Sequence, residues 1–249
     1  MARQRTPQGP PPPPPVQRLR IRYAKRGRMR FSSTRDIARA LERALRRAGI
    51  PMAFSAGFHP HPRISYANGA PTGAASEAEY VEIQVIEHLD PEAVREALDA
   101  ALPAGLDIVE VVVAGPGGLA DRLQASDWEL RFRGVASAEA ERAVAAYLAA
   151  ETAPVSRMFK TGPKTFDTRA AVVTIRVSGD ESGDCAILRV VVRHSTPSVR
   201  PDDILTALRA VGAFAPPVPP LVTRLAQGPL RDSGGVADPL AADKEAVGS

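Results

Sequence analysis

Two histidines lie two positions apart in the segment FSAGFHPHPRISY, residues 54–66, and a proline follows each of them. In an extended segment His59 and His61 would point to the same side, as in some zinc and copper sites. A metal ion needs a third or fourth ligand, and the remaining histidines, His88 and His194, are distant in sequence. Imidazole titrates near neutral pH, so one of these side chains could instead act as general acid or base in metal-independent RNA cleavage.

The prolines favour a third interpretation of this loop. Pro60 and Pro62 lack a backbone donor and hold the residue before them extended, which makes the loop stiff. A stiff loop can present rings and a cation to a partner, and the candidates here are Phe58, His59, His61, Arg63 and Tyr66. We keep His59 and His61 as candidate metal ligands or catalytic groups, and we expect the loop to act by binding.

Basic residues are concentrated near the start of the chain. The net charge is only +4, yet the segment from Gln17 to Arg47 contains twelve basic and only two acidic residues. Acidic residues dominate from Ala75 to Val112. This segregation predicts a basic face for a polyanion or an acidic protein surface, whereas an ordinary solvated surface in an arginine-rich chain is the alternative. The candidate contacts are Arg20, Arg22, Arg28, Arg30, Arg39 and Arg43.

A second basic cluster lies in RMFKTGPKTFDTR, residues 157–169. Lys160 and Lys164 would suit phosphates as point charges, and Arg169 could bind one with two hydrogen bonds. A solvated hairpin with a surface pair between Asp167 and Arg169 is the alternative.

A polar segment, RHSTPSVRPDD, follows at residues 193–203. Arg193 and the hydroxyls after it could hold an anion before a helix, or the hydroxyls could serve the turn. We find no catalytic triad, P-loop or dinucleotide-binding sequence, and we expect no cofactor.

The single cysteine, Cys185, excludes an internal disulfide, a cysteine-based zinc finger and an iron–sulfur cluster held by this chain alone. No segment has the roughly 20 apolar residues of a membrane span, and a proline run takes the place of a signal peptide. We therefore expect a cytoplasmic protein without a membrane partner. The pattern does not indicate an oligomeric state.

Residues 17–118 predict the order strand, helix, strand, strand, helix, strand. The first strand alternates apolar residues with an arginine face, and a helix capped by Ser32, Ser33 or Thr34 has the apolar stripe Ile37, Leu41 and Leu45. Asp90 and Pro91 are typical of a helix start. This order is that of a ferredoxin-like unit, which is an antiparallel sheet with two helices on one face.

The same order recurs over residues 119–226. We expect strands at residues 127–134, 170–177, 186–194 and 221–225, and helices at residues 138–150 and 201–211. The predicted fold is therefore α+β, with two tandem ferredoxin-like (βαββαβ) units. A proline-rich disordered arm (residues 1–16) precedes them and a disordered tail (residues 227–249) follows.

The segment GFHPHPRISYA, followed by SEAEYVEIQV and preceded by the helix SSTRDIARALERALRRAGIP, resembles the radical-SAM-linked family of domains of unknown function. The resemblance covers about residues 18–225 and includes the lysine-rich hairpin that ends in Asp-x-Arg. The segment GAPTGAAS departs from the bulkier apolar pair usual in that family. Its members are C-terminal extensions of radical-SAM proteins or free-standing chains, so the resemblance implies a free-standing member whose partner enzyme is encoded by another gene. It implies no established activity.

Three functions fit these patterns. The one we favour is an RNA-binding accessory module for structured or tRNA-like RNA, which works with an RNA-modifying, radical-SAM or RNA-processing enzyme and has no catalytic activity of its own. The second is a protein adaptor that docks a partner enzyme through its basic face. The third is a metal-independent ribonuclease or metal-dependent hydrolase that uses His59 and His61.

Overall fold

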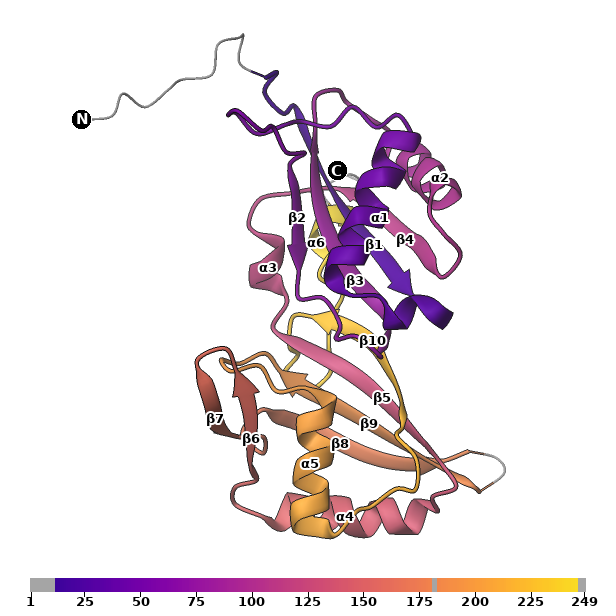
Figure 1. Cartoon of the computed structure of the whole chain (residues 1–249), viewed down its shortest axis with the longest axis vertical. Coiled ribbons are helices and arrows are strands. Elements are labelled where there is room, and N and C mark those ends of the chain that lie inside the picture. Colours follow the sequence, from indigo (N-terminus) through magenta and orange to yellow (C-terminus); the bar gives the residue numbers. More distant parts are fainter. Residues whose placement is uncertain (1–11, 181–182, 246–249) are drawn as a thin grey trace, which may run out of the picture. The chain divides into compact units, whose positions relative to one another are not determined.

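The computed structural model describes residues 12–180 and 183–245, and it confirms the α+β class (Figure 1). The described chain forms two compact units. The first comprises residues 12–73, 78–120 and 240–245. The second comprises residues 74–77, 121–180 and 183–239. Among the described residues, no helix has the length and apolar character needed to cross a bilayer.

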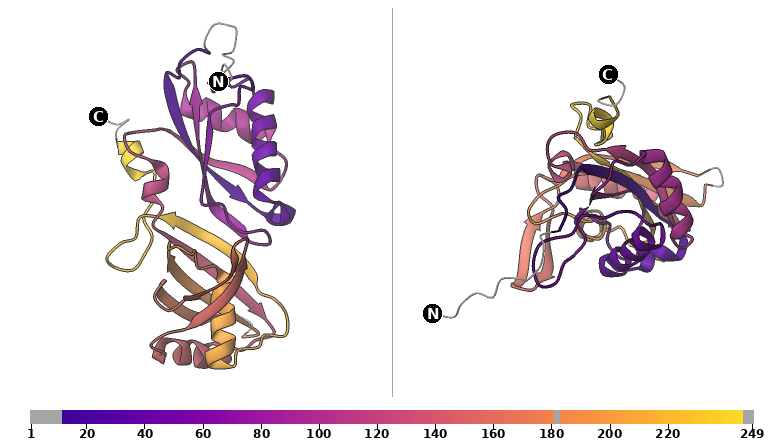
Figure 2. Two further views of the ribbon diagram at one scale, coloured as in Figure 1. Left: turned by 60° about the vertical axis from the view of Figure 1, so that its left-hand side comes forward. Right: turned by 90° about the horizontal axis from the view of Figure 1, so that it is seen from above.

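The first unit contains a sheet with the strand order β4-β1-β3-β2, and β1 pairs with β4 in antiparallel orientation. Helices α1 and α2 supply the apolar side chains that pack on one face of this sheet (Figure 2). The elements are β1 (Gln17–Lys25), a 3-10 helix η1 (Gly27–Phe31), α1 (Thr34–Arg47), β2 (Ile64–Ala67), β3 (Ala75–Val85), α2 (Pro91–Ala101) and β4 (Leu106–Val113).

Local signals in the sequence explain why α1 begins and ends where it does. The hydroxyl of Ser33 accepts a hydrogen bond from the Asp36 amide, and the Asp36 carboxylate accepts one from the Ser33 amide. The Ser33 hydroxyl also donates to the Asp36 carboxylate at 2.6 Å, and this bond, together with that from the Ser33 amide, holds the pKa of Asp36 below its usual value. Past the helix end Gly49 adopts a φ of 66°, which glycine allows at little cost. The predicted apolar stripe of this helix is buried in the core.

The second unit contains a sheet with the order β10-β5-β9-β8, whose neighbouring strands are antiparallel, and a separate hairpin of β6 and β7. Helices α4 and α5 contact each other. Ala75 and Ser76, at the start of β3, pair in parallel with β10. The elements are β5 (Ala125–Arg133), α4 (Ser137–Ala149), β6 (Pro154–Phe159), β7 (Gly162–Asp167), β8 (Val172–Gly179), β9 (Cys185–Arg193), α5 (Pro201–Gly212) and β10 (Leu221–Gly228); a short helix α3 (Leu119–Arg122) comes before β5.

The prediction of a disordered tail after residue 226 is wrong for the described part of that segment. Strand β10 continues to Gly228, Leu230 forms a β-bridge with Val236, and α6 (Ala241–Glu245) carries the fully buried side chain of Asp243. The low apolar content of the segment misled us because polar contacts to buried partners hold it in place. Residues 246–249 lie outside the described chain.

The predicted N-terminal arm lies largely outside the described residues, which start at residue 12. Residues 12–16 form neither helix nor strand. The Val16 amide donates a hydrogen bond to the Val85 carbonyl, so this short stretch runs into β1 beside the end of β3.

Candidate functional site

The proline-containing loop of the first unit is closed by its own hydrogen bonds. Phe54 and Pro62 form a β-bridge, the Ser55 amide donates to the His61 carbonyl at 2.9 Å, and the His61 amide donates to the Ser55 hydroxyl at 3.0 Å. The side chain of Phe58 is 60% exposed, and both histidines of the loop are exposed as well. Exposed rings on a braced loop are not explained by packing, and they are typical of a binding surface.

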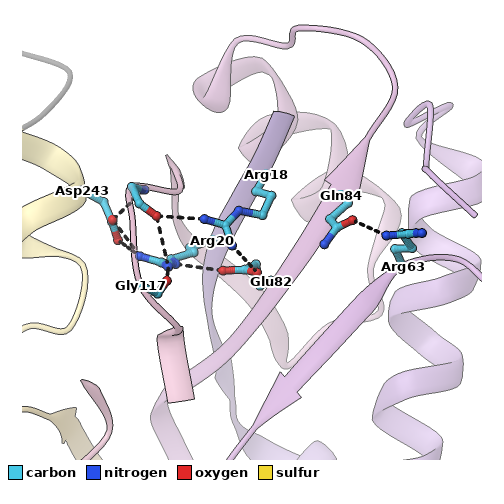
Figure 3. Close-up of polar contacts among 8 residues, drawn as sticks. Arg18, Arg20, Arg63, Glu82, Gln84, Gly117 and Asp243 are labelled. Carbon is cyan, nitrogen blue, oxygen red and sulfur yellow. Dashed lines mark hydrogen bonds and ion pairs between the residues drawn. The ribbon is translucent and has the colours of Figure 1, made fainter. Parts of the chain in front are cut away.

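Arg63 and Tyr66 follow the loop and are positioned by neighbouring elements. The Arg63 guanidinium donates to the Gln84 side chain of β3 at 3.2 Å (Figure 3). The Tyr66 hydroxyl donates to the Ala38 carbonyl of α1 at 3.4 Å, which places β2 beside that helix. Burial, with Glu42 adding to the effect, raises the pKa of Tyr66, so its hydroxyl stays neutral and can donate.

The outer side of α1 carries a row of exposed arginines. Arg39, Arg43 and Arg46 are separated by four and three positions and therefore lie on one side of the helix. Tyr66 of β2 contacts the carbonyl of Ala38, the residue before Arg39 in the same helix. We call these three arginines the arginine row.

The strand β1 does not present the arginine face that the alternation predicts. Arg20 is fully buried, and its guanidinium donates to Asp243 at 2.7 and 2.8 Å, to Glu82 at 3.0 Å and to the Gly117 carbonyl (Figure 3). Helix α6 covers this part of the strand. Arg20 is therefore a structural residue, and we remove it from the proposed contacts.

The other arginines predicted near the start of the chain differ in exposure. Arg22 is half-buried and Arg28 is exposed. The guanidinium of Arg30 is also half-buried and lies 4.7 Å from the ring centre of Phe31, a residue that is 60% exposed. Nothing in the sequence pattern singles out Phe31, whose exposure at the end of η1 becomes visible only in the structure.

The basic cluster of the second unit is built on the hairpin of β6 and β7. Lys160 and Lys164 are exposed, and the ammonium of Lys164 lies 5.5 Å from the ring centre of Phe159. The Asp167 carboxylate accepts hydrogen bonds from the Ala153 and Arg169 amides. It therefore braces the hairpin through the backbone.

The second unit contains two further predicted contacts. Arg169 follows the hairpin, and Arg193 is the last residue of β9. The Arg169 side chain is half-buried and donates to the Val172 carbonyl at 3.5 Å, so it does not point freely into solvent. Arg193 is exposed at the end of β9.

The structure pairs His194 with a residue that is 68 positions away in sequence. Its Nε2 lies 2.8 Å from the Ser126 hydroxyl and its Nδ1 lies 2.6 Å from the Leu123 carbonyl, so Nδ1 carries the proton and donates, and Nε2 accepts. Ser126 is only 2% exposed and cannot act as a nucleophile toward an external substrate. The neighbouring Ser195 donates to the Pro197 carbonyl and serves the turn, which was one of the two predicted roles.

Burial of His194, with nearby Arg224 adding to the effect, lowers its pKa from 6.5. The unfolded chain therefore binds more protons between the folded pKa and about 6.5, and the free energy of unfolding falls as pH falls, by at most about 1.4 kcal/mol per unit. We expect the free energy of unfolding of His194→Gln to fall less between pH 7.5 and pH 5.5 than that of the wild type. Urea unfolding followed by the fluorescence of Trp128 measures this difference, because Trp128 and His194 both lie in the second unit. Equal pH dependence in wild type and His194→Gln would contradict the assignment.

Within residues 12–180 and 183–245, no group of three or more histidine, cysteine, aspartate or glutamate side chains is arranged to hold a metal ion. The described chain thus supplies no third ligand to His59 and His61.

The fold and the exposed ring-bearing loop define an α+β protein with a candidate binding surface on its first unit. Residues 18–201 match the sequence model of a family described as "Uncharacterized protein conserved in bacteria (DUF2344)", and the chain belongs to this family. No curated protein matches the chain.

Solved structures with some likeness include a DyP-type peroxidase and a protein named DyPB. The encapsulated DyP-type peroxidase from Mycobacterium smegmatis has 11% identity and a TM-score of 0.21, with 88% of this chain and 94% of that chain covered. DyPB from Rhodococcus jostii RHA1 has 11% identity and a TM-score of 0.22, with 86% and 92% covered. Scores this low carry no argument about fold or activity.

Proposed function

We propose that this protein is an RNA-binding accessory module whose first unit binds unpaired nucleotides. The observation that carries the proposal is the braced loop with Phe58 exposed. Aromatic and histidine rings bind unpaired bases by stacking, and each stacked base contributes about 1–3 kcal/mol. The rings that can serve are Phe58, His59, His61 and Tyr66.

The cations around this loop support the same function. Arg63 is held beside the loop by Gln84, and the arginine row lies on α1. Arginines supply affinity for phosphates without regard to sequence, whereas stacked rings select unpaired regions. On the second unit, the exposed cations Lys160, Lys164 and Arg193 are further candidate phosphate contacts.

The strand orders support an assignment of both units to the ferredoxin-like fold. Each unit has two βαβ-type halves in the chain order βαββαβ, and its fourth strand lies beside its first in the sheet. In the second unit the β6–β7 hairpin is inserted after the first helix. Ferredoxin-like units host many functions, so the fold is compatible with RNA binding and does not argue for it.

A partner enzyme completes the proposal. The resemblance to the radical-SAM-linked family implies a radical-SAM, RNA-modifying or RNA-processing enzyme, to which this module would deliver RNA in the cytoplasm. The module itself contributes binding and no chemistry.

A series of ring substitutions tests the proposed loop contact. We expect Phe58→Ala to weaken binding of a fluorescently labelled single-stranded RNA by roughly 5–150-fold, the equivalent of one lost stack. The double variant His59→Phe/His61→Phe should bind nearly as wild type, because it keeps two rings, and His59→Ala/His61→Ala should bind more weakly. Fluorescence anisotropy measures all three.

Leu148→Ala is the control, since Leu148 is 43% exposed in α4 of the second unit and lies outside both the loop and the β6–β7 hairpin. Wild-type affinity in Phe58→Ala would remove the loop from the RNA site. Equal losses in the phenylalanine and alanine variants of the two histidines would indicate acid/base or ligand chemistry in place of stacking.

The exposed Phe54 and Phe58 side chains also fit a protein adaptor, because exposed apolar groups mark protein interfaces too. Affinity capture with and without nuclease separates the two functions. A stoichiometric protein partner that survives nuclease treatment, together with no retained RNA, would favour the adaptor.

A further inference from the structure

The segment η1 ends in an aromatic ring that the core of the first unit does not use. Phe31 is 60% exposed, and the Arg30 guanidinium lies over its ring, 4.7 Å from the ring centre. Because the guanidinium covers one face, the exposure of this side chain comes from its edge and its other face. Within the part of the chain that the structure describes, the Arg30 side chain forms no ion pair. Phe31 thus offers a ring face to solvent beside a positive charge that no carboxylate neutralises.

Hydrogen bonds and packing hold η1 in place. The Met29 amide donates to the Arg26 carbonyl at 3.0 Å, and the Ser32 amide donates to the Met29 carbonyl at 3.0 Å. The Arg30 carbonyl accepts a hydrogen bond from the Gly73 amide at 2.7 Å, and the Met29 side chain packs against the hydrophobic core. A ring on a braced segment loses little conformational freedom when a ligand stacks on it, which favours binding.

Phe31 and the proposed RNA-binding loop lie at opposite ends of α1. Phe31 comes three residues before the helix begins. The loop follows the end of the helix, since Met52, five residues past α1, pairs with Val85 at the end of β3. The 14 residues of α1 span about 20 Å. The first unit therefore has two separate groups of exposed rings.

Cations and a further ring lie between these two ends. Exposed Arg35, four positions before Arg39, continues the arginine row by one turn toward the start of α1. Across residues 12–180 and 183–245, neither Arg35 nor the arginine row forms an ion pair. Tyr66 of β2 lines one small cavity together with Ser32, the residue after Phe31, so the strand that continues the loop ends close to η1. A ligand that follows α1 from the loop would meet positive charge along its whole path.

We propose that an unpaired RNA strand runs from the loop along α1 to Phe31, an inference that rests on the proposed RNA-binding function. One base stacks on the solvent-facing side of the Phe31 ring, and Arg30 binds a phosphate next to it. The arginines of α1 bind the phosphates between the two groups of rings. A duplex keeps its bases stacked on each other and would leave the rings unused, so the ligand is single-stranded. At about 3.4 Å per stacked nucleotide, about six nucleotides cover the length of the helix.

The test compares oligouridylates of three and twelve nucleotides, because the shorter one cannot reach both ends of α1. We expect Phe31→Ala to weaken binding of the long strand by roughly 5–150-fold, the equivalent of one lost stack. Its affinity for the trinucleotide, which binds at the loop with its several rings, should stay within about twofold of wild type. Phe58→Ala should weaken binding of both, and Phe31→Trp, which keeps a ring, should bind the long strand as wild type does. Fluorescence anisotropy gives the affinity for the labelled long strand, and competition against it gives that for the trinucleotide.

A second variant tests the phosphate contact independently of the ring. Arg30→Gln should reduce the slope of log K against log salt by about 0.7 for the twelve-nucleotide strand and leave the slope for the trinucleotide unchanged. Val109→Ala is the control for both measurements, since Val109 is 39% exposed on β4, at the edge of the first unit's sheet opposite β2. Thermal melting shows that each variant is folded.

Wild-type affinity of Phe31→Ala for the long strand, together with a loss in Phe58→Ala, would overturn the inference and leave RNA binding at the loop intact. Equal losses in Phe31→Ala for the two lengths would also overturn it, because a trinucleotide does not extend from the loop to Phe31. If the wild type binds neither strand, the proposed function itself fails, and this inference fails with it.

Discussion

Replacing Asp243 by alanine is expected to lower the free energy of unfolding of the first unit by about 3–5 kcal/mol, the usual cost of breaking a buried ion pair. The Asp243 carboxylate accepts two hydrogen bonds from Arg20 and one from the Gly115 amide, and both charged side chains are fully buried. The substitution leaves a buried guanidinium with only part of its compensation. Hydrogen exchange of the β1 and α1 amides measures the effect, because the single tryptophan, Trp128, reports on the second unit.

Lys244→Ala in the same helix is the control. Its ion pair with Glu110 is partly exposed and is expected to contribute less than about 1 kcal/mol. The double variant Arg20→Met/Asp243→Leu should recover part of the loss, because it removes both buried charges and keeps apolar volume. If Asp243→Ala exchanges no faster than Lys244→Ala, the C-terminal helix does not stabilise the first unit in the way described.

Changing the arginine row to glutamine is expected to weaken RNA binding roughly 100-fold at about 0.1 M salt. Each phosphate contact to single-stranded RNA contributes about 0.7 to the slope of log K against log salt, so three lost contacts remove about 2 from it. The variant is Arg39→Gln/Arg43→Gln/Arg46→Gln. Glutamine has nearly the helix propensity of arginine, so α1 should remain folded. Anisotropy titrations at several salt concentrations give both numbers.

A charge-matched variant separates local contacts from net charge. Arg142, Arg176 and Arg209 are exposed in the second unit, and their replacement by glutamine removes the same total charge. We expect this variant to bind RNA within a few-fold of wild type. Equal losses in the two triple variants would show that the arginine row has no special role.

The elements that the sequence predicted are those with strong local signals. The hydroxyl residues at the start of α1, the Asp90–Pro91 helix start and the glycine after α1 all concern neighbouring residues, and the structure has helices at these places. The exposure of Phe58 and both loop histidines fits the predicted stiff loop, since Pro60 and Pro62 have no amide hydrogen to donate to a neighbouring strand.

Contacts between distant residues could not be predicted in the same way. The alternation in β1 shows two faces of a strand but not what covers each, so Arg20 was expected in solvent although Asp243, 223 positions later, buries it. The hydrogen bond between His194 and Ser126 also joins residues that are 68 positions apart, so the sequence pattern does not indicate it. Lys25 is one of the twelve basic residues between Gln17 and Arg47 from which a basic face was predicted, yet it is buried.

The most direct test of RNA binding by this chain is the salt dependence of its affinity for labelled single-stranded RNA between about 50 and 300 mM salt. We predict that log K falls steeply and linearly with log salt, and that the arginine row alone contributes about −2 to the slope. A flat response, or no binding at about 50 mM salt, would contradict the proposed function.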